Sequence, residues 1–126
     1  MPRRVLIVDD ENDIRTLLRV WVDVEADLEL AGEVDHGADA VPMATSLRPD
    51  IVVLDLEMPG MSGLEALPEL LSIEPPPAVV VYSIDGRART RALSMGAVAF
   101  VDKREPVRTL FDAVRDAGTT PDQKRS

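Results

Sequence analysis

The stretch IVVLDLEMPGMSGLEAL, residues 51–67, governs how the rest of the sequence is interpreted. It opens with four apolar residues in succession, three of them β-branched, as is typical of a strand that is covered on both faces in a parallel sheet. The run stops on Asp55, and Ser62 is a suitable N-cap for the leucine-rich segment that follows. The stretch therefore predicts a buried strand, a loop and a helix, with a carboxylate at the end of the strand.

The same alternation of strand and helix recurs along the chain. Strands are predicted at the apolar runs 5–8, 51–54 and 78–82, and less strongly at 28–34, which partly alternates, and 98–101. Helices are predicted by apolar residues at helical spacing over 14–22, 64–71 and 107–114, and further ones from near Asp39 and over 86–95. Strands alternating with helices predict an α/β fold, a doubly wound parallel sheet of five strands with five helices on both faces.

Three residues adjust the expected helix boundaries. Pro42 is expected in or near the first turn of its helix, where a missing N–H has little effect, whereas Pro68 is expected inside its helix. Gly96 is expected just beyond the end of the helix over 86–95.

Composition excludes several classes of protein. The chain has 126 residues, enough for one domain with its own core. The net charge of −9 has the wrong sign for a protein that binds nucleic acid directly. There is no cysteine, and no apolar run approaches the ~18 residues of a membrane span. We therefore expect a soluble, cytoplasmic protein that contacts neither nucleic acid nor membrane.

Polar side chains gather where the predicted strands end. Asp9, Asp10 and Glu11 follow the first strand, Asp55 the third and Ser83 the fourth, and the pair Asp102-Lys103 ends the fifth. In doubly wound sheets, sites form beyond the carboxyl ends of the strands. The sequence thus predicts one edge that holds several carboxylates, a hydroxyl and an ammonium group.

This set of groups suits phosphoryl transfer to an aspartate. Clustered carboxylates repel one another and need a cation, and oxygen ligands without His or Cys favour Mg²⁺. A metal ion, a lysine and a hydroxyl together stabilise the dispersed negative charge of a phosphoryl group in transfer. Taken singly, each residue would usually be a helix cap, a turn residue or a solvated side chain, and only the combination indicates a site.

The sequence resembles the receiver domain of two-component response regulators. The resemblance rests on VLIVDDENDIRTLL, PDIVVLDLEMPGMSGLEAL, VVVYS and RALSMGAVAFVDK, and it covers residues 4–116. It implies a flavodoxin-like fold with strand order 2-1-3-4-5, a receiver domain over 1–117, and a flexible tail or linker stump over 118–126.

The resemblance also implies roles for individual residues. Asp55 becomes the phosphoacceptor, and Lys103 contacts the phosphoryl group. Ser83 is the switch hydroxyl and Phe100 the switch aromatic. The Mg²⁺ ligands are then Asp9, Asp10, Asp55 and the backbone carbonyl of Glu57.

Two positions depart from the family pattern. Proline often follows the lysine directly, but here the order is Lys103-Arg104-Glu105-Pro106, so a cis peptide after the lysine would be several kcal/mol less favourable. Ile84 is bulky where a small residue is common, and we expect it to slow access to Asp55.

The function implied is a signalling switch rather than an enzyme. Asp55 would accept a phosphoryl group from a sensor histidine kinase or a histidine phosphotransfer protein. The response would appear on the face formed by the segments 86–95, 98–101 and 107–114, which could bind a partner, an output domain or a second copy. The alternatives are a haloacid-dehalogenase-like phosphatase, suggested by the acids at 55 and 57, and an interaction module that works without phosphorylation.

Overall fold

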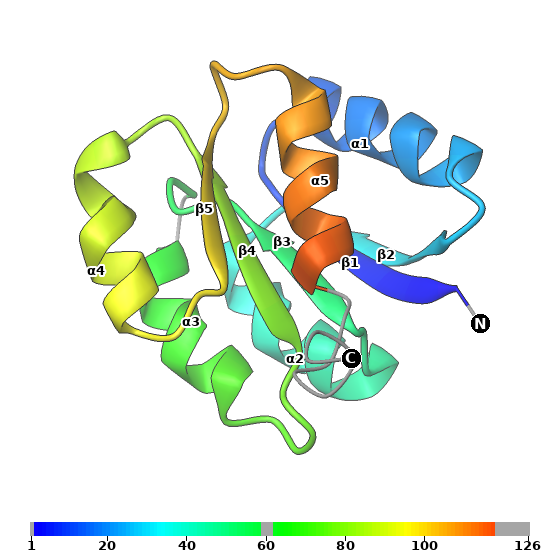
Figure 1. Ribbon diagram of the computed structural model, residues 1–126. Coiled ribbons are helices and arrows are strands. Elements are labelled where there is room, and N and C mark those ends of the chain that lie inside the picture. The colour runs from blue at the N-terminus through cyan, green and yellow to red at the C-terminus, as the bar shows by residue number, and fades with distance from the viewer. Residues whose placement is uncertain (1, 59–61, 118–126) are drawn as a thin grey trace, which may run out of the picture.

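Five parallel strands form one sheet in the order β2-β1-β3-β4-β5 (Figure 1). The computed structural model describes residues 2–58 and 62–117. The strands are β1 (Arg3–Val8), β2 (Leu28–Val34), β3 (Ile51–Leu54), β4 (Ala78–Ser83) and β5 (Ala99–Asp102). The helices are α1 (Asn12–Val24), α2 (Gly37–Leu47), α3 (Gly63–Leu71), the short 3₁₀ turn η1 (Gly86–Ala88), α4 (Arg89–Ser94) and α5 (Val107–Ala117). The predicted doubly wound fold and its strand order are confirmed.

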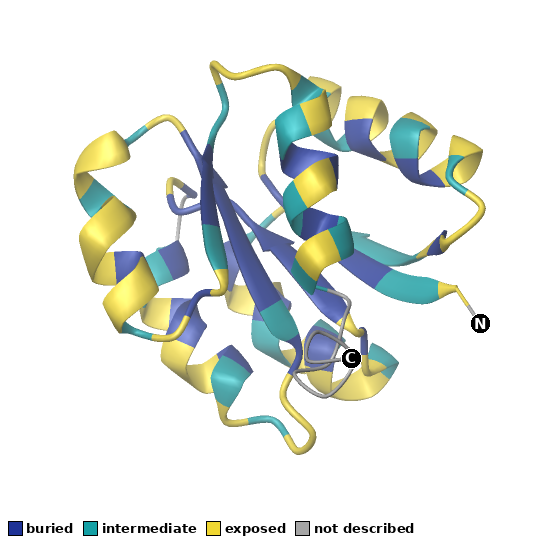
Figure 2. Ribbon diagram, viewed as in Figure 1, coloured by how far each residue is buried: buried dark blue, intermediate teal, exposed yellow. Residues whose placement is uncertain are grey.

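Helices cover both faces of the sheet. One apolar cluster lies between the sheet and α1 and α5, and a second lies between the sheet and α2, α3 and α4. The central strands are buried along most of their length while the outer faces of the helices are exposed (Figure 2). The uninterrupted IVVL run of β3 is therefore explained, because alternate side chains enter opposite clusters and none meets water.

The predicted helix boundaries are confirmed only in part. Ser62 caps α3 by accepting a hydrogen bond from the Glu65 N–H at 3.3 Å, and Gly96, with φ of 116°, follows α4 as expected. The expectation for Pro42 is wrong, because α2 already begins at Gly37 and the proline lies inside the helix. The predicted helix over 86–95 is divided into η1 and α4.

Gly63 lets α3 begin directly against the loop that carries Asp55. A Cβ atom at this position would lie 2.5 Å from the Asp55 carbonyl oxygen and 2.6 Å from the Leu56 Cα. The Gly63 N–H donates to the Leu56 carbonyl at 3.1 Å. Only glycine fits so close to backbone atoms, so this residue sets the distance between α3 and the carboxyl end of β3.

None of the helices in the described part of the chain is long and apolar enough to cross a membrane.

Candidate functional site

Three carboxylates meet at the carboxyl edge of the sheet. Asp9 follows β1 and Asp55 follows β3, and each is only 2% exposed, whereas Asp10 is exposed. One oxygen from each of the three residues lies within 4.8 Å of the others. The prediction that the strand ends bring these acids together is confirmed by their positions.

Backbone hydrogen bonds fix the two buried carboxylates in the same way. The N–H of Asp9 donates to the Val34 carbonyl at 3.0 Å, and that of Asp55 donates to the Val8 carbonyl at 2.9 Å, so both residues are tied to the neighbouring strand. Each carboxylate then accepts from the N–H two residues further on. Asp9 Oδ1 accepts from Glu11 at 2.9 Å and Asp55 Oδ1 from Glu57 at 3.1 Å.

Lys103 supplies the positive charge of this cluster. Its Nζ lies 2.9 Å from Asp9 Oδ2, 3.5 Å from Asp55 Oδ2 and 3.2 Å from Glu11 Oε1, and its side chain is only 7% exposed. The Lys103 N–H donates to the Ser83 carbonyl at 3.1 Å, which ties β5 to β4 at this edge. Within residues 2–58 and 62–117 the cis peptide is Glu74–Pro75, so the bond after Lys103 is trans.

The electrostatics of the cluster are dominated by burial. Burial, followed by the charge of Asp9, raises the pKa of Asp55 from 3.8 to about 7. Burial also raises the pKa of Asp9, although Lys103 opposes this. For Lys103 burial by itself would lower the pKa, but hydrogen bonding to Asp9 and the charges of Asp55 and Asp9 outweigh it and raise the pKa. The lysine stays charged, and once both acids are ionised they carry more negative charge than its single positive charge can balance.

The carboxylates fit a divalent cation. Three oxygens within 4.8 Å of one another, two of them on buried side chains, form a hard-ligand set of the kind that binds Mg²⁺. Asp10 is exposed, so a cation would keep water on its outer side, as Mg²⁺ prefers. A bound Mg²⁺ would neutralise the repulsion between Asp9 and Asp55 and polarise phosphoryl oxygens.

Ser83 ends β4 and faces the same edge. It is fully buried, and its hydroxyl accepts from the Asp85 N–H at 3.1 Å and donates to Glu57 Oε1 at 3.4 Å. The Glu57 side chain therefore takes part in the site as a hydrogen-bond partner of Ser83. The receiver-domain resemblance implied only a backbone role for Glu57, as a carbonyl ligand of the metal.

Phe100 lies inside the protein rather than on its surface. The residue is 5% exposed and belongs to the cluster under α2, α3 and α4, and the Arg89 guanidinium lies 5.0 Å from the centroid of its ring. The ring is thus already turned inward in this structure.

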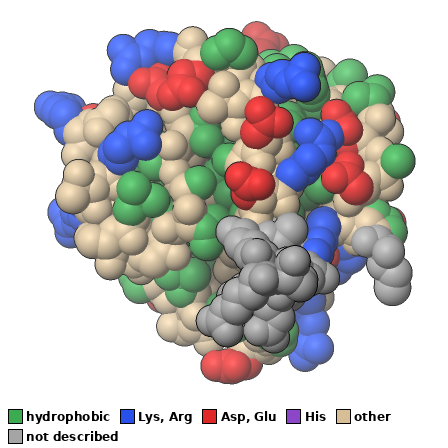
Figure 3. Space-filling model, viewed as in Figure 1, with side chains coloured by type: hydrophobic (Ala, Val, Ile, Leu, Met, Phe, Trp, Pro, Cys, Tyr) green, Lys and Arg blue, Asp and Glu red, His purple; other side chains and the backbone are tan. Residues whose placement is uncertain are grey.

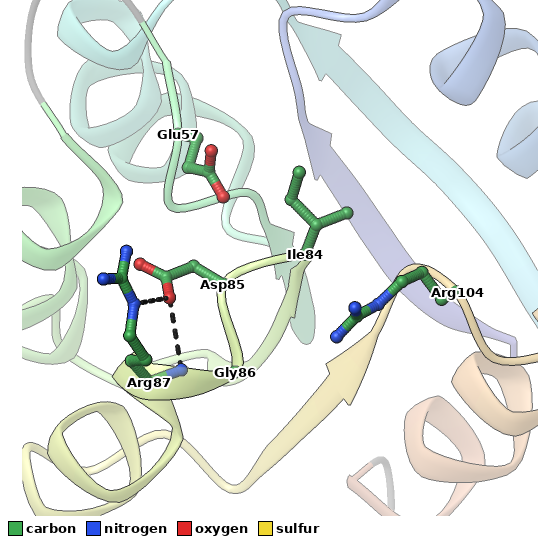
Figure 4. A pocket seen from close by; sticks show the side chains of 6 residues that line it. All are labelled: Glu57, Ile84, Asp85, Gly86, Arg87 and Arg104. Carbon is green, nitrogen blue, oxygen red and sulfur yellow. Dashed lines mark hydrogen bonds and ion pairs between the residues drawn. The ribbon is translucent and has the colours of Figure 1, made fainter.

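Ile84 lines a hollow next to Glu57, the hydrogen-bond partner of Ser83. It is 54% exposed and lines an open hollow of about 530 Å³ together with Glu57, Arg104 and the turn Asp85–Arg87 (Figure 4). In Figure 4 its side chain projects from the end of β4 between Glu57 and Arg104, while Arg87 turns back to pair with Asp85 at 3.0 Å. A bulky side chain therefore occupies the rim of the hollow beside Glu57.

The α4 side of the molecule is locally basic. Figure 3 shows Lys and Arg side chains grouped on this side, where α4 and η1 contribute the exposed residues Arg87, Arg89 and Arg91. Exposed apolar side chains accompany them, namely Leu93 at 40% and Val98 at 53%. This mixture of charge and apolar area contrasts with the acidic charge of the whole chain.

Two further residues take part in the site. Glu11 binds the Lys103 ammonium, and Arg15 donates to the Asp9 carbonyl at 2.6 Å. From the sequence, Glu11 was expected at this edge but without a partner, and Arg15 was not expected at the site. Position 15 is one helical turn from Glu11, so helical spacing was the signal that could have found it.

Comparisons with known proteins agree with this geometry. Residues 5–115 match the family model of the response regulator receiver domain. A protein-glutamate methylesterase/protein-glutamine glutaminase of Rhodopseudomonas palustris is 40% identical over 111 residues, and the match covers 85% of this chain and 28% of that protein. The response regulator GacA of Pseudomonas aeruginosa is 36% identical over 115 residues, and the match covers 89% of this chain and 53% of that protein.

A solved structure of a response regulator domain has the same fold as this chain. The response regulator domain of Thermotoga maritima CheB is 31% identical and superposes with a TM-score of 0.83, covering 96% of this chain and all of that domain. The family match decides against the haloacid-dehalogenase-like alternative. The chain belongs to the response regulator receiver domain family, and it is a phosphorylation-activated switch module of two-component signalling.

Proposed function

We propose that Asp55 is the phosphoacceptor and that its donor is a phosphohistidine of a sensor kinase or histidine phosphotransfer protein. A carboxylate oxygen of Asp55 attacks phosphorus, the P–N bond to the imidazole breaks, and the released imidazole takes up a proton. The observation that carries the proposal is the position of Asp55, which is buried beside Asp9 and has the Lys103 ammonium 3.5 Å away. Catalysis is then mainly positioning and charge stabilisation.

The residues around Asp55 would have different roles in the transfer. Asp9, Asp10, Asp55 and the Glu57 carbonyl would hold Mg²⁺, which supplies the charge that neutralises the phosphoryl oxygens. Lys103 would turn from Asp55 to a phosphoryl oxygen without leaving Asp9, because its ammonium has three donors. The domain would act on itself, with no separate substrate to turn over, and would work in the cytoplasm.

The proposal is tested by phosphorylation with acetyl phosphate and Mg²⁺, followed by intact-mass measurement. Wild type should gain one phosphoryl group that is lost in base, and Asp55→Asn should gain none, because an amide has no nucleophilic oxyanion. Asp102→Asn is a matched control, since Asp102 also ends a strand but pairs with Arg104 at 2.6 Å. Phosphorylation of the Asp55→Asn variant at the wild-type level would refute the assignment, and a chain that takes no phosphate would favour an interaction module.

We further propose that the site communicates with the α4-β5-α5 face through Ser83 and Phe100. A phosphoryl oxygen offers Ser83 a charge-assisted hydrogen bond worth roughly 1.5–3 kcal/mol, which would draw its hydroxyl from Glu57. Because the Phe100 ring already lies inward under Arg89, phosphorylation would stabilise this arrangement and lower the population of an outward one.

The output surface would be the exposed mixture of arginine and apolar side chains on η1, on α4 and at Val98, the residue before β5. It suits an acidic partner, an output segment or a second copy of the chain. The net charge of −9 argues against direct contact with nucleic acid.

The chain spans 28% of the length of the methylesterase relative and 53% of the length of GacA. The tail predicted at 118–126 lies outside the described residues.

A further inference from the structure

Asp9 and Asp10 belong to the loop between β1 and α1, so the conformation of this loop sets the positions of their carboxylates. Its first N–H is fixed, because Asp9 donates to the Val34 carbonyl at 3.0 Å. At its other end Glu11 is the N-cap of α1 but makes no side-chain capping hydrogen bond. The side-chain hydrogen bond that reaches this loop from the helix comes from Arg15.

Arg15 binds the backbone of the loop and leaves the carboxylates of Asp9 and Asp10 available to a cation. Its Nη1 donates to the Asp9 carbonyl at 2.6 Å and its Nη2 to Asn12 Oδ1 at 3.1 Å. Its side chain is 14% exposed, and a shielded, charge-assisted hydrogen bond is stronger than one in water. The Asp9 carboxylate meanwhile accepts from the Glu11 N–H and binds Lys103.

Glu33 balances the charge of Arg15. A guanidinium this close to the acids would compete with a cation unless another carboxylate neutralised it. The Arg15 Nε lies 3.7 Å from Glu33 Oε1, and the Arg19 Nη1 lies 2.7 Å from Glu33 Oε2. Glu33 thus joins two arginines of α1 to the end of β2.

A bulge in β2 brings Glu33 to the correct face. The pairing of β1 with β2 skips Ala31, which is the extra residue. Leu30, before the bulge, packs in the cluster under α1, whereas Val34, after it, packs in the cluster under α2. Because side chains alternate along a strand, regular pairing would put Glu33 on the α2 face, and the extra residue turns it to α1.

We propose that Arg15 is a positioning residue for the cation site, with Glu33 as its counter-charge. By holding the Asp9 carbonyl, Arg15 fixes the loop before a cation arrives, so less conformational entropy is lost on binding. Residues that orient metal ligands typically change metal affinity 10–100-fold when removed. This inference rests on the proposed function, since it takes Mg²⁺ as the cation.

The test is the Mg²⁺ dissociation constant of the unphosphorylated protein, measured by isothermal titration calorimetry at pH 8 and fixed ionic strength. Arg15→Ala should weaken binding about tenfold, and Arg15→Lys should recover part of the loss because an ammonium can still donate to the Asp9 carbonyl. Arg19→Ala is the matched control, since it removes the other arginine bound to Glu33 but leaves the Asp9 contact. It should bind Mg²⁺ within about twofold of wild type.

The positioning role and the cation assignment fail in different ways. Wild-type affinity in folded Arg15→Ala, or an equal loss in Arg19→Ala, would overturn the positioning role. If Arg15→Ala does not fold, the test uses Arg15→Lys instead. Wild-type Mg²⁺ affinity in Arg15→Lys, together with a tenfold loss in Arg19→Ala, would also overturn the positioning role. Failure of wild type to bind Mg²⁺, or unchanged binding by Asp10→Ala, would instead overturn the cation assignment.

Discussion

Asp55→Asn is expected to stabilise the protein at pH 8 in metal-free buffer. Asp55 is 2% exposed, and burial together with the charge of Asp9 raises its pKa from 3.8 to about 7. The Lys103 ammonium at 3.5 Å opposes this rise without cancelling it. The ionised carboxylate is therefore less favourable in the folded protein than in the unfolded chain, whereas an asparagine amide carries no charge.

The magnitude follows from the difference between the two pKa values. That difference is about 3, and at ~1.4 kcal/mol for each factor of ten it corresponds to at most ~4 kcal/mol. Between about pH 4 and pH 7 the folded protein keeps a proton that the unfolded chain has released, so the free energy of unfolding falls as pH rises and levels off above pH 7. Since Asp9 and Asp55 titrate together, we expect the asparagine variant to gain ~2–4 kcal/mol at pH 8 and close to nothing below pH 4.

Urea unfolding from pH 4 to pH 9 with EDTA present measures this effect. Trp21 fluorescence reports tertiary structure, because its ring stacks on Phe111 with centroids 5.3 Å apart. Asp102→Asn is the control: the hydrogen bond from Arg104 lowers the pKa of Asp102 to about 2, so removing that charge should bring no gain at pH 8. An Asp55→Asn protein that is no more stable than wild type at pH 8, or that gains equally at pH 4 and pH 8, would refute the reasoning.

Four further outcomes are expected. Mg²⁺ at about 100 times its Kd should raise the free energy of unfolding by about 2.7 kcal/mol, and a melting shift that survives Asp10→Ala would contradict the cation site. Gly63→Ala should destabilise by roughly 1–3 kcal/mol in urea and slow phosphorylation, because its Cβ meets the backbone of Asp55 at 2.5 Å; unchanged stability would show that α3 can move away. Ile84→Ala should speed both phosphorylation by acetyl phosphate and loss of the phosphoryl group about tenfold, a barrier change of ~1.4 kcal/mol. Equal rates in wild type and Ile84→Ala at the same Mg²⁺ concentration would show that Ile84 does not slow access to Asp55. Ser83→Ala should still be phosphorylated but lose most of its partner or dimer response in binding assays, and a full response would break the link to the α4-β5-α5 face.

The sequence by itself determined the layers of the fold and the residues at the reactive edge. Runs such as IVVL at 51–54 are apolar at every position, and only a strand covered on both faces makes that pattern favourable. In a parallel sheet all strands end at the same edge, so acids placed after strands must converge. Asp9, Asp10, Asp55, Ser83 and Lys103 could therefore be predicted as one site from their positions after strands.

Tertiary structure decided the contacts that depend on register and on side-chain rotamers. The bulge at Ala31 turns Glu33 toward Arg15, and nothing in the partly alternating run 28–34 specifies which residue is skipped. The inward Phe100 ring and the bond from Ser83 to Glu57 likewise depend on how distant elements pack. Periodicity is a property of neighbouring residues, so it reveals elements and their order, whereas these contacts join residues far apart in the chain and exist only once the sheet has formed.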